Sequence, residues 1–351
     1  MTGRKTRTAT KVGLAGPKAE KTIALALQGG GAHGAFTWGV LDQLIEDGRL
    51  GFEAISGASA GAMNAVAMTD GWQEGGPEGA RAKLETFWRE VSYDGKLNEC
   101  ERTAFDALLD FWAPLTSSAA FGYWRGTLSP SQANPLDLNP LRDALTRLLD
   151  FERIRAAPIH LFVATTRVWT GKIRVFETQE LTETHILASA CLPTIFRAVE
   201  IDGEPYWDGG YTGNPPLWPL YYGIDTDDLL LVQINPVERH ETPTSVTAIQ
   251  DRLNEITFNA GLLGELRVLD FVTQLVDDGK LDRASYKRVN FHRIDGRDQT
   301  LKFAASSRMK ADWDLFRELR DIGRSRAEEW LKENYDGIGE RSTLDLRSAY
   351  A

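Results

Sequence analysis

A serine flanked by two glycines has the clearest chemical potential in this sequence. Gly57 and Gly61 surround Ser59 in the pattern Gly-x-Ser-x-Gly. The pattern is typical of a sharp strand-to-helix turn that presents a serine as a nucleophile, although a plain tight turn also matches it. Residues 53–56 are predicted to form a short strand and residues 60–68 a buried helix. Free backbone amides at the start of that helix would face an anion formed on the serine.

A second glycine-rich turn precedes the first. Residues 22–27 form an apolar run that predicts a buried strand, and the segment Gln28–Gly34 follows it directly. An amphipathic helix comes next, and Gly48 is expected to end it. A strand, a glycine loop and a helix in this order form a turn that can bind an anion.

Two kinds of site compete for this loop. Gly29, Gly31 and Gly34 match Gly-x-Gly-x-x-Gly, the fingerprint of a dinucleotide site. Such a site also needs an acidic residue at the end of the next strand, whereas Glu53 lies near that strand's start. The other kind is an oxyanion hole, in which amides of Gly30–Gly31 stabilise a tetrahedral intermediate on the serine. Two such turns after neighbouring strands would meet at one sheet edge, which favours the oxyanion hole.

An aspartate ends a predicted hairpin. Residues 197–207 suit two short strands joined by a turn at Asp202-Gly203. Asp208 follows directly, and Gly209 and Gly210 allow another backbone to come close. Most Asp-Gly pairs are ordinary turns, so this segment by itself indicates only a capped loop.

With these motifs in this order, the chain resembles the patatin-like phospholipase family over about residues 20–236. The segment Ala188–Pro193 also looks like the family's helix end and proline turn. The resemblance implies a Ser-Asp dyad instead of a Ser-His-Asp triad, with Ser59 as the nucleophile and Asp208 as its base. It further implies an oxyanion loop formed by Gly29, Gly30 and Gly31.

One position departs from the family pattern. The family usually has arginine or lysine where this chain has His33, and a histidine is only partly charged near neutral pH. The departure puts the rate and its pH dependence in question, and packing at the helix start is the alternative role for this side chain. The residues expected to support the site are His33, Gly34, Gly57, Gly61, Gly209 and Gly210.

The histidines test the dyad independently. There are five, at positions 33, 160, 185, 240 and 292. His292 is the strongest rival base, but it lies in a strand-like alternation that favours a half-exposed structural residue. His160 and His185 are expected to be structural, and His240 lies in a polar loop. No Cys-His cluster, His-Glu-x-x-His pattern or acidic metal loop occurs, so the sequence indicates no metal and no cofactor.

Alternating strands and helices predict a three-layer α/β/α fold with a mostly parallel central sheet. The expected strands are 22–27, 53–56, 159–166 and 229–235, with the hairpin added. The expected organisation is a disordered basic arm at 1–21, a catalytic domain at 22–236, a mainly helical C-terminal extension packed on it at 237–335 and a loose tail at 336–351.

Two further segments have alternative interpretations. A long helix over about 246–272 is expected to be scaffold or a homodimer surface. The aromatic-rich stretch at 105–124 has helical spacing over residues 105–112, and Pro114 interrupts it. It would either pack on the sheet or cover an acyl-chain pocket and contact a lipid surface.

Amino-acid composition further narrows the possible classes of protein. The chain has 351 residues, of which 42% are hydrophobic, enough for a large core. A net charge of −10 disfavours nucleic acid as a partner. Cys100 and Cys191 are too few for a disulfide framework. The basic arm lacks the apolar core of a secretion signal, and no apolar run is long enough to span a membrane. The expected location is therefore the cytoplasm, with or without peripheral lipid association.

The expected function is hydrolysis of fatty-acyl esters of lipids, as in a phospholipase or lysophospholipase. Aspartate is ordinarily a weak base with a pKa of about 3.9, so burial or a short hydrogen bond to Ser59 must compensate. The alternatives are acyl transfer, hydrolysis of another ester such as a storage polyester, and a catalytically weak lipid-binding or regulatory protein. Because the chain has both Ser59 and Asp208, an enzyme is favoured over the last alternative.

Overall fold

The computed structural model describes residues 13–92, 139–193, 196–296 and 312–350. The predicted aromatic-rich segment at 105–124 and Cys100 lie outside these residues.

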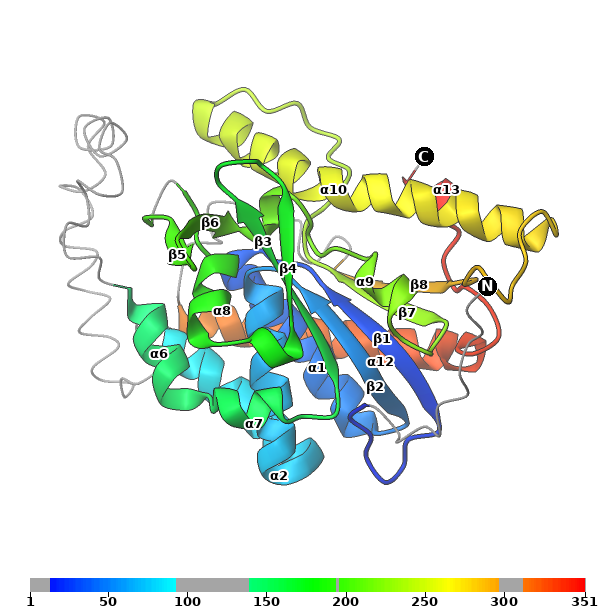
Figure 1. Ribbon diagram of the computed structural model, residues 1–351, viewed down its shortest axis with the longest axis horizontal. Helices are drawn as coiled ribbons and strands as arrows, with labels where there is room; N and C mark the ends of the chain where they lie inside the picture. The colour runs from blue at the N-terminus through cyan, green and yellow to red at the C-terminus, as the bar shows by residue number, and fades with distance from the viewer. Residues whose placement is uncertain (1–12, 93–138, 194–195, 297–311, 351) are drawn as a thin grey trace.

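A mixed sheet forms the middle of the molecule (Figure 1). Its strands follow the order β5-β6-β3-β2-β1-β7-β8, and β4 pairs with β3 off this path. Strands β3, β2, β1, β7 and β8 run parallel to their neighbours, whereas β4 and β6 are antiparallel to β3. The strand bounds are β1 Lys21–Leu27, β2 Leu50–Gly57, β3 His160–Arg167, β4 Ile173–Glu177, β5 Val199–Ile201, β6 Glu204–Asp208, β7 Asp228–Gln233 and β8 Asn290–Asp295.

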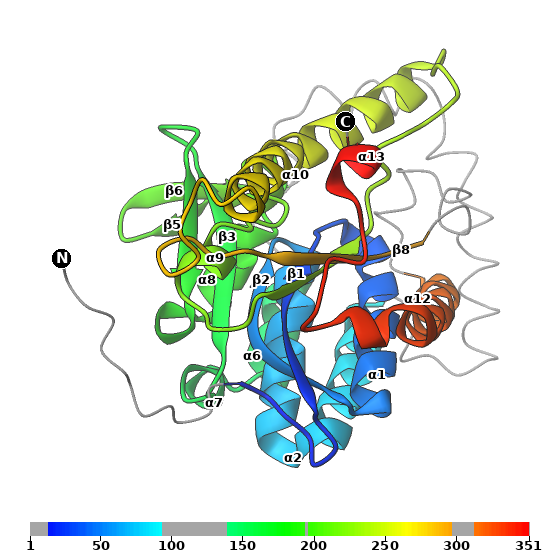
Figure 2. The same ribbon diagram turned by 90° about the vertical axis from the view of Figure 1, so that its right-hand side faces the viewer.

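Helices cover both faces of this sheet, which gives the predicted three-layer α/β/α arrangement (Figure 2). One face bears α1 Gly34–Asp47, α2 Ala60–Val91, α6 Pro140–Leu148, α7 Phe151–Arg155, α8 Glu183–Ser189 and α12 Trp313–Asn334. The other face bears α9 Pro219–Tyr222, α10 Val246–Asp277 and α13 Leu346–Tyr350. Short 3₁₀ turns occur at Gly31–His33, Thr178–Glu180, Gly209–Tyr211 and Tyr335–Gly337.

The residues of β1 explain why both faces need cover. Ile23, Leu25 and Leu27 pack into the core below α1 and α2, whereas Ala24 and Ala26 face the second cluster beneath α10. A strand that buries both faces needs an unbroken apolar run, as parallel strands usually have. At the end of α1, Gly48 adopts a left-handed conformation with φ of 77°, the helix stop expected from the sequence.

At both ends of the chain the structure differs from the expected domain bounds. Of the predicted basic arm, residues 13–20 pack on the domain and Lys21 begins β1. Leu14 is buried and exchanges two backbone hydrogen bonds with Phe52. The predicted loose tail is also wrong, because Ile338 and Tyr350 are buried and the Tyr350 hydroxyl donates to Gln233. In both segments, a few apolar side chains within a polar sequence are buried against the domain and hold the backbone on it.

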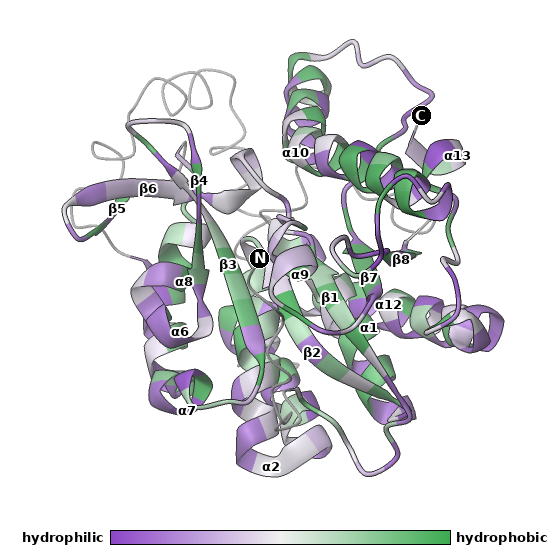
Figure 3. Ribbon diagram, turned by 45° about the vertical axis from the view of Figure 1, so that its right-hand side comes forward, coloured by the Kyte–Doolittle hydropathy of each residue, from purple (hydrophilic) through white to green (hydrophobic). Residues whose placement is uncertain are grey.

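The C-terminal extension is helical, but it also completes the sheet through β8. On α10, Leu266 and Leu269 are buried as the spacing suggests. Other apolar side chains of this helix are exposed: Val246, Ile249, Leu253, Ile256, Val268 and Phe271. Figure 3 shows apolar residues along much of α10. Within the described residues, no helix combines the length and apolarity needed to cross a bilayer.

Candidate active site

Ser59 occupies the sharp turn between β2 and α2. Its backbone has φ of 51° and ψ of −123°, a conformation that is rare for residues other than glycine. The side chain is largely buried, with 8% of its surface exposed. Ala60 begins α2 directly after it, so the serine lies at the helix N-terminus, where backbone amides favour negative charge.

Close backbone contacts explain the glycines of this turn. A Cβ on Gly61 would collide with the carbonyl oxygen of Leu27 and lie 2.9 Å from that of Gln28. A Cβ on Gly29 would lie 2.7 Å from the carbonyl oxygen of Ala58 and 2.8 Å from Ser59 Cβ. The end of β1 and the serine turn are therefore in direct contact, as expected for turns after neighbouring parallel strands.

Gly61→Ala should destabilise the protein by about 1–3 kcal/mol or more, because the new methyl group meets backbone that cannot yield cheaply. The matched control is Gly264→Ala on α10, where a Cβ has open space and alanine should stabilise the helix by up to ~1 kcal/mol. Denaturant unfolding measures both changes. Equal stability of the two variants would show that the close approach at Gly61 is not needed.

Asp208 is the last residue of β6 and is completely buried. Antiparallel pairing of β6 with β3 places it opposite Thr165, and Thr166 donates its hydroxyl to the Asp208 carbonyl at 2.8 Å. Carboxylate Oδ1 accepts the Gly210 amide at 2.7 Å. Oδ2 has no hydrogen-bond partner among the described residues. One carboxylate oxygen is thus fixed and the other is available for a proton.

Burial raises the pKa of Asp208 from its ordinary 3.8 to about 7, and the Gly210 amide and the Ser59 hydroxyl act in the opposite direction. The serine hydroxyl is therefore near enough to favour the ionised carboxylate. No hydrogen bond of ordinary geometry joins the two side chains, since Oδ2 is unpaired. The raised pKa makes Asp208 a stronger base than an exposed aspartate. Burial is one of the two ways in which the weak basicity of an aspartate was expected to be compensated.

The end of α8 contacts both residues of the predicted dyad. The Ser59 backbone N–H donates to the Ser189 hydroxyl at 2.9 Å. Two residues later, the Cys191 carbonyl accepts the Asp208 backbone N–H at 2.8 Å. One short turn therefore holds Ser59 and Asp208 in fixed positions relative to each other. The sequence indicated a helix end here, but nothing in it marked Ser189 as a partner of Ser59.

The glycine loop lies between the ends of β2 and β7. The Gly29 amide donates to Asn214 Oδ1 at 2.6 Å and is therefore occupied. Among the described residues, the backbone N–H groups of Gly30 and Gly31 have no acceptor. His33 ends the 3₁₀ turn and is buried, with 6% of its surface exposed. Tight contacts surround the other supporting glycines: Gly34, Gly57, Gly209 and Gly210.

The other histidines form no hydrogen bond to Ser59, Asp208 or the glycine loop within the described part of the chain. Both ring nitrogens of His292 have partners, Asp228 at 3.0 Å and Thr343 at 2.8 Å. The residue is fully buried, so the expected half-exposed position is wrong; the C-terminal segment covers it. His160 begins β3 and His185 lies in α8, as expected. Within the described ranges, no three histidine, cysteine or acidic side chains are grouped to hold a metal ion.

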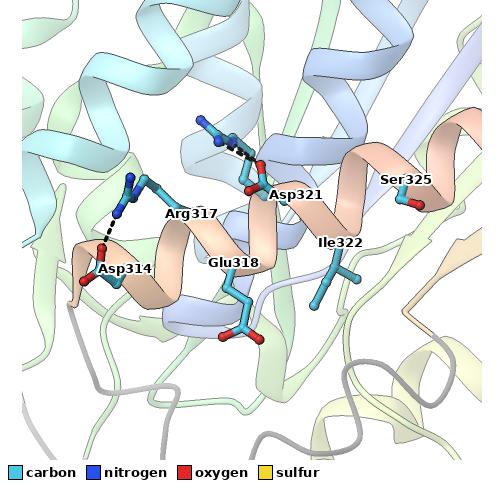
Figure 4. A pocket seen from close by; sticks show the side chains of 7 residues that line it. Asp314, Arg317, Glu318, Asp321, Ile322 and Ser325 are labelled. Atoms are coloured by element: carbon cyan, nitrogen blue, oxygen red, sulfur yellow. Dashed lines mark hydrogen bonds and ion pairs between the residues drawn. The ribbon is translucent and has the colours of Figure 1, made fainter.

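Two surface hollows are lined by neither Ser59 nor Asp208. One of about 600 Å³ lies on α12, lined by that helix alone, with Arg317 paired to Asp314 (Figure 4). Another of about 740 Å³ lies beyond the ends of β7 and β8. Its lining includes Ile234 and Asn235, which also contact the glycine loop.

Comparisons with known proteins give a family for this chain. VipD from Legionella pneumophila is a similar solved structure, with a TM-score of 0.36 and 15% identity over 87% of this chain and 67% of that one. No curated protein sequence matches the chain. The model of the family described as patatin-like phospholipase matches residues 25–221, more than half of the chain. The protein therefore belongs to the patatin-like phospholipase family, whose members are typically hydrolases of lipid esters.

Proposed function

We propose that the protein hydrolyses fatty-acyl esters of lipids, as a phospholipase or lysophospholipase does, through Ser59 and Asp208. The observation that carries the proposal is a strained serine turn beside a buried carboxylate that has one unpaired oxygen. Asp208 takes the proton as Ser59 Oγ attacks the ester carbonyl, and an acyl-enzyme forms as the alcohol leaves with a proton. Asp208 then activates a water molecule that releases the fatty acid.

The proposed oxyanion hole uses the amides of Gly30 and Gly31. Both lie in the loop that contacts Ser59, and neither has another acceptor among the described residues. The Gly29 amide supports the loop instead, because Asn214 occupies it. Donors already in place before the reaction stabilise the developing negative charge without reorganisation.

Fluorophosphonate labelling combined with a substrate panel tests this function. The label should attach to Ser59, and phospholipids, lysophospholipids and p-nitrophenyl esters should be hydrolysed to free fatty acid. Transfer of the acyl group to an added alcohol in preference to water would favour acyl transfer. A folded protein that neither reacts with the label nor cleaves any ester would favour the lipid-binding alternative.

The ratio kcat/KM should rise with pH with an apparent pKa of about 7. Asp208 acts as a base only when ionised, and its pKa is raised, so activity falls as pH drops through that value. The profile is measured from about pH 5 to about pH 9 with spontaneous hydrolysis subtracted. A limb centred near the ordinary aspartate pKa, or a flat profile, would contradict a buried Asp208 base.

Contact with a lipid surface forms part of the proposal. The exposed apolar side chains of α10 support it, and Phe271 with 59% of its surface exposed is the largest of them. Co-sedimentation with neutral phospholipid vesicles should weaken in Phe271→Ser. A homodimer through the same face would appear instead as a change in molecular mass by light scattering.

A further inference from the structure

One asparagine side chain holds both polar backbone groups of Gly29. Asn214 Oδ1 accepts the Gly29 N–H at 2.6 Å, and its Nδ2 donates to the Gly29 carbonyl at 3.2 Å. Asn214 is completely buried. Two hydrogen bonds from one planar amide fix the orientation of a residue more tightly than one bond can, because they prevent rotation about either.

The side-chain amides of other buried residues hold Asn214 and Gly29 in place. Gln28 Oε1 accepts the backbone amides of Ile234 at 2.9 Å and Asn235 at 2.8 Å, while its Nε2 lies 3.3 Å from the Asn214 carbonyl. Asn235 adds a second donor to the Gly29 carbonyl at 2.9 Å. We call Gln28, Asn214 and Asn235 the amide cluster. It ties the glycine loop to the chain after β7 and to the segment that follows Asp208.

The position of Gly29 gives this cluster a consequence for catalysis. Gly29 packs against the serine turn so closely that a Cβ would lie 2.8 Å from Ser59 Cβ. Its carbonyl belongs to the same peptide plane as the Gly30 N–H, because a peptide group is rigid and planar. Holding the Gly29 carbonyl therefore sets the direction in which the Gly30 N–H points.

We propose that Asn214 is a positioning residue that orients the Gly29–Gly30 peptide toward the oxyanion formed at Ser59. The inference rests on the proposed serine hydrolase function. Asn214 touches no substrate; it acts through the loop. Its loss removes the acceptor of the Gly29 N–H and one of the two donors to the Gly29 carbonyl, so that Asn235 alone restrains the peptide plane. A donor displaced by about 1 Å can cost about 10²-fold in rate.

The test compares Asn214→Ala and Asn214→Asp with wild type. Both variants remove the Asn214 donor to the Gly29 carbonyl and leave the Asn235 donor in place. The aspartate keeps the side-chain volume if the alanine protein folds poorly. Each should lower kcat by about 10²-fold with KM within about threefold of wild type. A hexyl trifluoromethyl ketone, which forms a hemiketal oxyanion with serine, should lose affinity in proportion to kcat/KM, whereas an unreactive hexyl ether should not.

Asn290→Ala is the matched control. Asn290 is also buried and donates to Asp228 at 3.3 Å, at the start of β8, away from the glycine loop. The Asn290→Ala protein should be less stable than wild type, with an unchanged kcat. Wild-type kcat in both Asn214 variants, with Ser59→Ala inactive, would overturn the positioning role alone. Full activity of Ser59→Ala would overturn the proposed function together with this inference.

Discussion

Ser59→Ala should abolish ester hydrolysis and fluorophosphonate labelling while leaving the free energy of unfolding within about 0.5 kcal/mol of wild type. The substitution removes one hydroxyl. The hydrogen bond from the Ser59 backbone N–H to Ser189 is unaffected, and alanine meets the same backbone conformation as serine. Single-turnover hydrolysis and chemical denaturation measure the two effects. Turnover within about tenfold of wild type would exclude Ser59 as the nucleophile.

Ser56→Ala supplies the control with the opposite expectation. Ser56 lies three residues earlier in β2, is fully buried and donates its hydroxyl to the Pro216 carbonyl at 2.6 Å. Its loss leaves a buried acceptor without its partner and should cost about 1–3 kcal/mol. Activity per folded molecule should persist. The pair of variants therefore separates loss of chemistry from loss of structure within one segment.

Asp208→Asn should lower turnover by about 10³-fold, because a neutral amide cannot take the serine proton. The fold should tolerate the change, since asparagine can still accept the Gly210 amide through Oδ1. His292→Ala should keep the chemistry, because its ring nitrogens bond to Asp228 and Thr343. Equal losses in the two variants would indicate a histidine-containing triad instead of the dyad.

The same Asp208→Asn variant should be more stable than wild type at pH 8. The pKa of Asp208 is about 7 in the folded protein and its ordinary value is 3.8, so the folded state disfavours the charge. Folding loses stability as pH rises from about 4 to about 7, where only the unfolded chain ionises, and the loss levels off above pH 7. Three pKa units correspond to about 4 kcal/mol.

Unfolding measured at pH 4 and pH 8 tests this linkage. The advantage of Asp208→Asn should be small at pH 4 and full at pH 8. A pH-independent difference between the variant and wild type would mean that burial does not raise the pKa of Asp208. Together, inactivity and added stability would identify Asp208 as a residue that costs stability for its chemistry.

Local patterns accounted for most of the elements. Apolar runs predicted β1, β2, β3 and β7, and Gly48 predicted the end of α1, because burial and backbone sterics act within a few residues. Strand β4 was not predicted; charged residues at positions 174 and 177 interrupt its short apolar pattern. For α10 the sequence left open whether the helix is scaffold or a homodimer surface, and it did not show which apolar side chains are exposed. Its buried Glu255 pairs with Arg239 and Arg252, so polarity did not mark the outer face.

The sequence by itself determined the motif order, the α/β/α class and the candidate residues, since glycines at fixed spacing leave few backbone geometries open. Only the tertiary structure decided what each residue contacts. Asn214 is hydrogen-bonded to Gly29, which lies 185 residues away in the sequence, and Ser189 to Ser59, which lies 130 residues away. The pKa of Asp208 depends on burial by β3 and its neighbours, which no local pattern records. Hydrogen-bond partners and desolvation are properties of packing, so they appear only when distant segments come together.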